Sequence, residues 1–309
     1  MKIGIIGRSK LTYDSMVLAK EEGHDITFIV TSKEAPEYSK TSSDFRKFAI
    51  KYDIPFLHDA KINVEKLRQL TTMSSTELCI SINYNGILNE EIINFFPNGI
   101  LNAHGGDLPR YRGNACQAWA IINGEEKIGL CIHRMVGGEL DSGDILGRKY
   151  YPININTKIG EVYKWFERDI PTLFLEVIEI LKSNPSYMLE TQSKDPLKAL
   201  RCYPRMPDDG RIDWTQCAEQ ILRLINASSE PYSGAFSYDQ KGRKVTIWRA
   251  SLIQDNENYL AIPGQIAQII NEGCVVISGR GKILLREVSI EDERGSPSEF
   301  FKSIRTRFS

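Results

Sequence analysis

The sequence lacks the features that mark membrane proteins and disulfide-rich secreted proteins. No run approaches the roughly 18 apolar residues that a membrane-spanning helix needs. The glycine-broken start, Met1–Gly7, is typical of a strand and not of a signal peptide. The six cysteines are scattered, with no C-x-x-C pair and no histidine at ligand spacing, so neither a disulfide framework nor a metal site is expected. These absences make the cytoplasm the expected location.

The sequence also lacks an excess of charge and the common nucleotide-binding motifs. Its 39 Lys and Arg balance 40 Asp and Glu, for a formal net charge of −1. Such a balance offers no overall attraction for nucleic acid. After the first expected strand the chain has Gly7-Arg8-Ser9, which is neither G-x-G-x-x-G nor a P-loop. A nucleotide cofactor held by either motif is therefore not expected.

The chain does have the length and apolar content for two domains with sizeable cores. It has 309 residues, 41% of them hydrophobic, against about 100–200 residues in a typical domain. Apolar runs alternate with helical patterns up to residue 200, which indicates β-α-β units and a mostly parallel, Rossmann-like sheet of the α/β class. The expected strands are Lys2–Gly7, Asp25–Val30, Ile54–Leu57, Leu78–Ile82, Ile100–His104, Gly129–Met135 and Asp144–Tyr150. The expected helices are Leu11–Glu22, Ser43–Tyr52, Val64–Leu70 and Gly160–Leu181.

The pattern changes after about residue 205. A short helix over Cys217–Asn226 is followed by short strands with turns between them, which predicts a small β-rich, barrel-like domain. These strands are expected at Gly234–Tyr238, Lys244–Ala250, Gly264–Ile270, Cys274–Ser278 and Lys282–Ile290. The tail is charged from Glu293, and its last ten residues, F-F-K-S-I-R-T-R-F-S, are compatible with a final helix. We place the domain boundary between residues 200 and 201, with an α/β domain over 1–200 and a β-rich domain over 201–309.

Open α/β sheets bind ligands beyond the carboxyl ends of their strands, which draws attention to the end of Ile100–His104. Asn102 and His104 are two residues apart on an extended strand and therefore point to the same side. The Gly105-Gly106 pair that follows lets a ligand approach the backbone. An amide can donate to a developing oxyanion and an imidazole can move a proton. The alternative for an isolated N-x-H pattern is a structural polar pair.

Asp141 lies in a second polar segment, the glycine-containing turn Glu139–Leu146. A solvated turn is the alternative interpretation, because Asp and Gly are common turn residues. His133, on the expected strand before this turn, is predicted to be structural or to form a pocket wall. His24 and His58 carry no functional prediction.

Three separated segments together resemble the folate-dependent formyltransferase family. They are N-A-H-G-G-D-L-P-R-Y-R-G from Asn102, G-L-C-I-H-R-M from Gly129 and D-S-G-D-I-L from Asp141. P-D-D-G-R-I-D-W, P-Y-S-G-A-F, V-T-I-W and P-G-Q-I resemble the family's C-terminal module, so the resemblance covers nearly the whole chain. It implies the formyltransferase fold, with the catalytic domain over 1–200. One departure is Gly106-Asp107, where the family often has Ser-Leu, and it places a carboxylate near the expected acceptor channel.

The resemblance implies transfer of a formyl group from 10-formyltetrahydrofolate to a primary amine through a tetrahedral intermediate, without a metal. Asn102, His104 and Asp141 are the implied catalytic residues. Asn102 and His104 supply oxyanion donors, His104 is the first choice for the base, and Asp141 orients it or relays the proton itself. Which of His104 and Asp141 is the base stays open. The implied folate contacts are Tyr84, Asn85, Gly86, Ile87, Leu88, Met135, Gly138 and Leu140, with core packing as the alternative for Tyr84 and Ile87.

The family divides by acceptor. Methionyl-tRNA formyltransferases carry a long basic insertion after the second strand, whereas Thr31–Ser43 of this chain is short and has two Lys against two Glu. Binding of tRNA relies on phosphate neutralisation, which this loop does not supply. The loop resembles that of sugar-nucleotide formyltransferases, so we predict a UDP- or dTDP-linked amino sugar as acceptor, in lipopolysaccharide or surface-glycan biosynthesis, and not tRNA. The expected acceptor contacts are Arg8, Ser9, Gly106, Asp107, Arg110 and Arg112.

Three other functions stay open at this point. The first is methionyl-tRNA formyl transfer. The second is a non-catalytic formyltransferase-like binding module, although the intact Asn102, His104 and Asp141 argue against a decayed site. The third is a hydrolase that releases formate from the same folate, which would normally carry an N-terminal regulatory domain before Met1. The particular sugar, nucleotide and amine position stay open, as does the oligomeric state, with a homodimer as one option.

Overall fold

The computed structural model describes residues 1–36, 38–71, 75–254, 256–291 and 293–309, which form two compact units. The first unit consists of Met1–Gly113, Gly129–Tyr151 and Tyr163–Cys202. The second consists of Asn114–Ile128, Pro152–Val162 and Tyr203–Ser309. Within the described ranges, no helix has both the length and the apolar character to cross a membrane.

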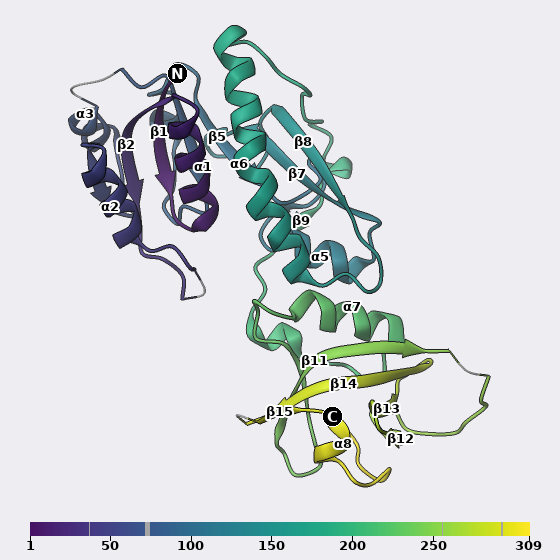
Figure 1. Ribbon diagram of the computed structural model, residues 1–309. Coiled ribbons are helices and arrows are strands. Elements are labelled where there is room, and N and C mark those ends of the chain that lie inside the picture. The colour runs from purple at the N-terminus through teal and green to yellow at the C-terminus, as the bar shows by residue number, and fades with distance from the viewer. Residues whose placement is uncertain (37, 72–74, 255, 292) are drawn as a thin grey trace. The chain divides into compact units, whose positions relative to one another are not determined.

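A seven-stranded sheet is the centre of the first unit (Figure 1). Its strands are β1 (Lys2–Gly7), β2 (Asp25–Thr31), β3 (Phe56–His58), β4 (Leu78–Ile82), β5 (Ile100–His104), β7 (Lys127–Arg134) and β8 (Ile145–Pro152). They lie in the order β3-β2-β1-β4-β5-β7-β8; β1 to β5 pair in parallel, and β7 runs antiparallel to β5. The prediction of a mostly parallel, Rossmann-like α/β sheet is confirmed. A second, two-stranded sheet pairs β6 (Arg112–Gly113) with β9 (Arg201–Cys202).

Helices cover the sheet of the first unit because its strands are apolar on both faces. These helices are α1 (Lys10–Glu21), α2 (Ser42–Lys51), α3 (Val64–Leu70), α4 (Glu90–Ile93) and the long α6 (Ile159–Ser183). Leu67 and Ile92 pack with Phe28 in one buried cluster, which places α3 and α4 against the sheet. Leu173 and Val177 leave no room for a side chain at Gly147, so α6 packs closely on β8.

The strand order reverses between β1 and β4, because β2 and β3 continue to one side of β1 and β4 and β5 to the other. Such a reversal leaves a crevice at the carboxyl ends of the two strands, where open α/β sheets bind ligands. Arg8 follows β1 at this point and donates through Nε to the carbonyl of Asn83, which follows β4 (2.7 Å). The carboxyl ends of β1, β4 and β5 therefore lie at the same edge of the sheet.

The second unit is built on an antiparallel sheet, and the prediction of a β-rich C-terminal module is confirmed. Its strands are β10 (Ala235–Tyr238), β11 (Lys244–Ile253), β12 (Ile266–Ile270), β13 (Gly273–Ile277), β14 (Lys282–Ile290) and β15 (Glu293–Gly295), and β10-β11-β14-β13-β12 is the order of the main path. Its helices are α5 (Cys116–Asn123), α7 (Ala218–Ser228) and α8 (Pro297–Phe300). One 3-10 turn, Pro207–Gly210, lies in this unit, and another, Pro196–Lys198, lies in the first unit. Helix α7 contacts both α5 and β11, and its apolar residues Leu222 and Ile225 are fully buried.

The prediction of a final helix is wrong beyond residue 300. Helix α8 ends at Phe300, and the residues after it contain a turn at 304–305 and a bridge between Arg307 and Gln265. The N–H of Phe308 donates to the carbonyl of Gly264 (2.8 Å), and Ser309 and Tyr238 exchange two backbone hydrogen bonds. These partners come from distant parts of the chain, and Phe308 is buried in the core they form. Tertiary pairing therefore satisfies the backbone groups that a helix would have paired locally.

Helix α5 was not predicted from the sequence, and its local signals are weak. Its N-cap is Ala115, which adopts a left-handed conformation (φ 51°) and makes no side-chain cap. Buried residues lie on most sides of the helix, so no amphipathic period marks it. The sequence pattern does not predict α5, and its packing against α7 accounts for its formation.

Candidate active site

The pairing of β5 with β7 brings Asn102, His104 and His133 into one cluster. The antiparallel register places Asn102 opposite His133 and His104 opposite Cys131. Because side chains alternate along a strand, Asn102 and His104 share a face, as predicted. His104 and His133 are both buried, and Nδ2 of Asn102 lies 3.1 Å from Nε2 of His133.

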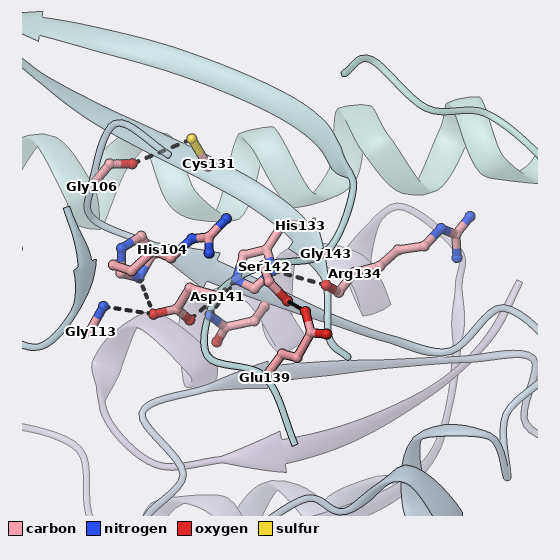
Figure 2. Close-up of polar contacts among 12 residues, drawn as sticks. His104, Gly106, Gly113, Cys131, His133, Arg134, Glu139, Asp141, Ser142 and Gly143 are labelled. Atoms are coloured by element: carbon pink, nitrogen blue, oxygen red, sulfur yellow. Dashed lines mark hydrogen bonds and ion pairs between the residues drawn. The ribbon is translucent and has the colours of Figure 1, made fainter. Parts of the chain in front are cut away.

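Asp141 lies between the two imidazoles (Figure 2). Its Oδ2 is 3.5 Å from Nδ1 of His104, and its Oδ1 is 3.6 Å from Nε2 of His133. Oδ2 also accepts a hydrogen bond from the N–H of Gly113 (2.9 Å). Burial by itself would raise the pKa of this carboxyl, but the two imidazoles and the Gly113 N–H outweigh burial and lower the pKa to about 2. Asp141 is therefore ionised at neutral pH.

The contacts of His104 determine which ring nitrogen carries a proton. Nε2 lies 2.6 Å from the carbonyl oxygen of Tyr111, and a carbonyl can only accept, so Nε2 carries the hydrogen. The lone pair of the neutral ring is then on Nδ1, which faces Asp141. Burial lowers the pKa of His104 below its ordinary range, although Asp141 and the Tyr111 carbonyl act in the opposite direction. At neutral pH the ring can accept a proton on Nδ1, and the Asp141 carboxylate would stabilise the resulting cation.

The second glycine after His104, Gly106, is required by close packing. A Cβ atom at Gly106 would lie 2.3 Å from the carbonyl oxygen of Tyr111 and 2.7 Å from Nε2 of His104. Any larger residue would therefore displace the contact that orients the imidazole. Gly106 therefore leaves room for the contact between His104 and the Tyr111 carbonyl.

Asp107 is held by neighbouring side chains. Nη1 of Arg148 and the hydroxyl of Tyr150 both donate to its Oδ1, the latter over 3.0 Å. Arg148 also donates through Nη2 to the carbonyl of Leu108 (2.9 Å) and to the carboxylate of Glu190 (2.8 Å). The carboxylate that departs from the family pattern thus anchors its loop to β8.

Arg112 and Gln192 contact each other beside the turn that carries Asp141. Nη2 of Arg112 donates to Oε1 of Gln192 (2.8 Å). Nε2 of Gln192 donates to the carbonyls of Asp141 (2.8 Å) and Gly143 (2.7 Å). Nε of Arg112 is buried and has no hydrogen-bond partner in the described part of the chain. Sequence reasoning missed Gln192, since one amide in a polar, proline-bounded segment has no pattern that distinguishes it.

Replacement of Gln192 by Leu should destabilise the protein and reduce turnover. The carbonyls of Asp141 and Gly143, the second of them buried, would lose their donor, at a cost of about 1–3 kcal/mol in the free energy of unfolding. Asp141 has a left-handed backbone (φ 48°), and its turn would lose two hydrogen bonds. Urea titration checks the stability, and steady-state kinetics should show kcat reduced by about tenfold. Gln69→Leu, at an exposed position of α3, is the control, and equal effects in both variants would contradict this role.

The two segments expected to hold the folate lie next to each other. A Cβ at Gly137 would lie 2.8 Å from the backbone nitrogen of Glu90, so the turn after β7 packs against the segment that follows β4. These segments expose three apolar side chains, Ile87 (87%), Val136 (41%) and Leu140 (39%). Exposed apolar groups around a polar site fit an aromatic ligand such as a pterin. Core packing, the alternative for Ile87, is wrong, and Val136 was not predicted.

The other expected folate contacts lie in the same two segments. Tyr84 points into the unit, where its hydroxyl donates to the carbonyl of Asp59 (2.7 Å) and burial raises its pKa to about 12. Leu88 is buried in the core and Met135 packs against it. The structure places these three side chains in or against the core, so Tyr84 fits the core-packing alternative. Asn85 is exposed, Gly86 fits tightly beside the Tyr84 ring and Gly138 has a left-handed backbone (φ 76°).

The remaining acceptor candidates have separate surroundings. Arg8 donates through Nη1 to the carbonyl of Lys33 (2.7 Å), and its Nε is bonded to the loop after β4. Ser9 is buried at the start of α1. Arg110 is exposed and its guanidinium lies 5.3 Å from the centroid of the Tyr111 ring. Of the predicted acceptor arginines, Arg112 is the one whose charge bears on His104, where it lowers the imidazole pKa.

Both parts of the chain match models of one family. Residues 1–178 match the formyl transferase model, and residues 205–305 match its C-terminal domain. The chain belongs to the formyl transferase family. Membership of this family identifies it as a folate-dependent N-formyltransferase. No group of three or more His, Cys, Asp or Glu among the described residues is arranged to hold a metal ion.

Known proteins resemble this chain along most of its length. A methionyl-tRNA formyltransferase of Acetivibrio thermocellus is 30% identical over 300 residues, covering 95% of this chain and 93% of the relative. An N-formyltransferase from Helicobacter canadensis, solved with folinic acid and dTDP-3-aminofucose, has a TM-score of 0.70 at 17% identity, covering 93% of this chain and 99% of that one. HypX from Aquifex aeolicus, solved with tetrahydrofolic acid, has a TM-score of 0.61 at 16% identity; the match covers 98% of this chain and 47% of HypX, so this chain spans about half its length.

Proposed function

We propose that this formyltransferase transfers the formyl group of 10-formyltetrahydrofolate to the primary amine of a nucleotide-linked amino sugar, within surface-glycan biosynthesis. The co-substrate follows from the family. The acceptor is the part of this proposal that goes beyond the family. It rests on the charge of the loop between β2 and α2. A tRNA acceptor needs a basic surface, and this loop has two Lys balanced by two Glu.

One backbone carbonyl and one lysine side chain of this loop have local contacts. The carbonyl of Lys33 accepts a hydrogen bond from Arg8, and Nζ of Lys40 lies 4.5 Å from the centroid of the Tyr13 ring. The loop is therefore tied to the ends of β1 and α1. Over residues 203–309, too, Lys and Arg balance Asp and Glu. Neither segment presents the excess of positive charge that binding of a polyanion requires.

The chemistry assigned to the site needs three groups. His104 accepts the proton of the attacking amine on Nδ1, because Nε2 is occupied by the Tyr111 carbonyl. Asp141 stays ionised and stabilises the imidazolium; with a pKa of about 2 it is too weak a base for the amine proton. Asn102 donates through Nδ2 to the oxygen that becomes negative in the tetrahedral intermediate. Collapse of the intermediate breaks the bond between the formyl carbon and the folate nitrogen, and the His104 imidazolium returns its proton to that nitrogen, which releases tetrahydrofolate. This division of roles favours His104 over Asp141 as the base.

Arg112 is our candidate for contact with the acceptor. Its buried Nε has no hydrogen-bond partner in the described residues, while Nη2 is held by Gln192. A guanidinium with a free N–H and a fixed orientation suits a phosphate or a sugar hydroxyl. A sugar nucleotide needs only one or two such groups.

Methionyl-tRNA formyl transfer is the second candidate function. It is favoured by the Acetivibrio thermocellus relative, whose 30% identity extends over nearly both full chains. The amine chemistry at His104 would be the same, so the two functions differ only in how the acceptor is recognised.

A panel of acceptors with 10-formyltetrahydrofolate should separate the two functions. We expect formylated product from a UDP- or dTDP-linked amino sugar, followed by mass spectrometry, and weak, salt-sensitive turnover of Met-tRNA. Arg112→Ala should raise the KM for the sugar nucleotide by about tenfold, the effect of one lost charged hydrogen bond.

Arg68→Ala, at an exposed position of α3 that is not among the expected acceptor contacts, is the control and should leave this KM unchanged. Efficient formylation of Met-tRNA near 150 mM salt, with no product across the amino-sugar panel, would refute the proposed acceptor and establish the second candidate.

A further inference from the structure

His133 makes two contacts that together determine where its proton is. Its Nδ1 lies 2.9 Å from the carbonyl oxygen of Arg134, and its Nε2 lies 3.1 Å from Nδ2 of Asn102. A carbonyl oxygen can only accept, so Nδ1 must donate and must carry the hydrogen. In the neutral ring Nε2 is then an acceptor.

An acceptor at Nε2 determines which way the Asn102 amide faces. The two ends of an amide have nearly the same shape, and only their hydrogen bonds distinguish them. With Nε2 as acceptor, the nitrogen of Asn102 must face His133. The described residues give the Asn102 side chain no other hydrogen-bond partner. The second hydrogen on Nδ2 is thus left for a ligand.

We propose that His133 is a positioning residue for formyl transfer: its Nδ1–H tautomer, held by the Arg134 carbonyl, orients the Asn102 amide so that Nδ2–H faces the developing oxyanion. The inference rests on formyl transfer at this site and is independent of the acceptor. Without the contact the amide turns freely, and part of the time Oδ1 faces the oxyanion, where it repels the charge. His133 is 2% exposed, so its ring is held away from bulk water.

The orientation of the Asn102 amide does not depend on a hydrogen bond between Asp141 and His133. Oδ1 of Asp141 lies 3.6 Å from Nε2 of His133, beyond hydrogen-bond distance, and its Oδ2 is bonded to the N–H of Gly113. The contact between Nδ2 of Asn102 on β5 and Nε2 of His133 on β7 is 3.1 Å, which is shorter than the 3.6 Å between His133 and Asp141. His133 therefore acts on Asn102 in this arrangement.

Nitrogen NMR of the wild-type protein at pH 7.5 tests the tautomer without any substrate. Long-range proton–nitrogen correlations distinguish a protonated Nδ1 from a protonated Nε2. We expect His133 to carry its hydrogen on Nδ1, as the Arg134 carbonyl requires. A spectrum in which Nε2 carries the hydrogen would overturn the inference, whatever the enzyme's acceptor.

Kinetics of matched variants test the consequence. His133→Leu should lower kcat by about tenfold with little change in the KM of the folate, and His133→Gln, which offers an acceptor oxygen to Asn102, should keep kcat within about threefold of wild type. The Asn102→Ala, His133→Leu double variant should be no slower than Asn102→Ala alone, because His133 acts through Asn102. Multiplicative losses in the double variant, or equal losses for Leu and Gln at 133, would overturn the inference. If Met-tRNA is the acceptor that is turned over, the proposed sugar acceptor is wrong. The same kcat comparisons, made with Met-tRNA, then still test the role of His133.

Discussion

His104→Ala should reduce kcat by at least about 100-fold while the protein remains folded. The substitution removes the free Nδ1 that accepts the amine proton, and with it the cation that Asp141 would stabilise. The contact to the Tyr111 carbonyl is also lost, but it lies in a loop that Asp107 anchors separately. Initial rates at saturating folate and acceptor measure the effect, and circular dichroism checks the fold.

The control for this variant is His58→Ala. His58 is exposed at the end of β3, which β2, β1 and β4 separate from β5. It should retain the wild-type kcat. A folded His104→Ala protein with near-normal turnover would remove His104 from the mechanism.

Asp141→Asn should also lower kcat by about 100-fold and should move the acidic limb of the pH–rate profile to lower pH. The sign follows from the contacts of His104: burial lowers its pKa and the Asp141 carboxylate raises it, so removal of the carboxylate lowers the pKa further. The rate falls as His104 becomes protonated, and this happens at a lower pH in the variant. Measurement of kcat/KM from pH 4.5 to 8 shows the shift. Asn tolerates the left-handed backbone at position 141, so the turn should be preserved.

Asp144→Asn is the matched control, because Asp144 lies in the same turn and pairs with neither imidazole among the described contacts. Its profile should coincide with that of the wild type. If Asp141→Asn shifts the acidic limb upward, or leaves both rate and profile unchanged, the assignment of Asp141 as the group that stabilises the His104 cation is incorrect.

The parallel sheet could be predicted from the sequence because its strands are marked locally. Leu78–Ile82 and Ile100–His104 are short apolar runs with turn residues around them, and their predicted bounds agree with the structure. Helix α3 was predicted with its correct bounds, and its N-cap is made by Asn63, whose side chain accepts from the N–H of Lys66. Helix α5 and the extended tail were missed, since distant partners stabilise both.

The sequence by itself determined the α/β class, the change to a β-rich module and the common face of Asn102 and His104, because strand period and turn residues are local properties. Only the tertiary structure decided that His133 lies opposite Asn102 and that Gln192 holds the turn of Asp141. Both facts depend on register and on loop packing between segments far apart in the chain, where the partner of a buried polar group is set by geometry and no sequence spacing encodes it.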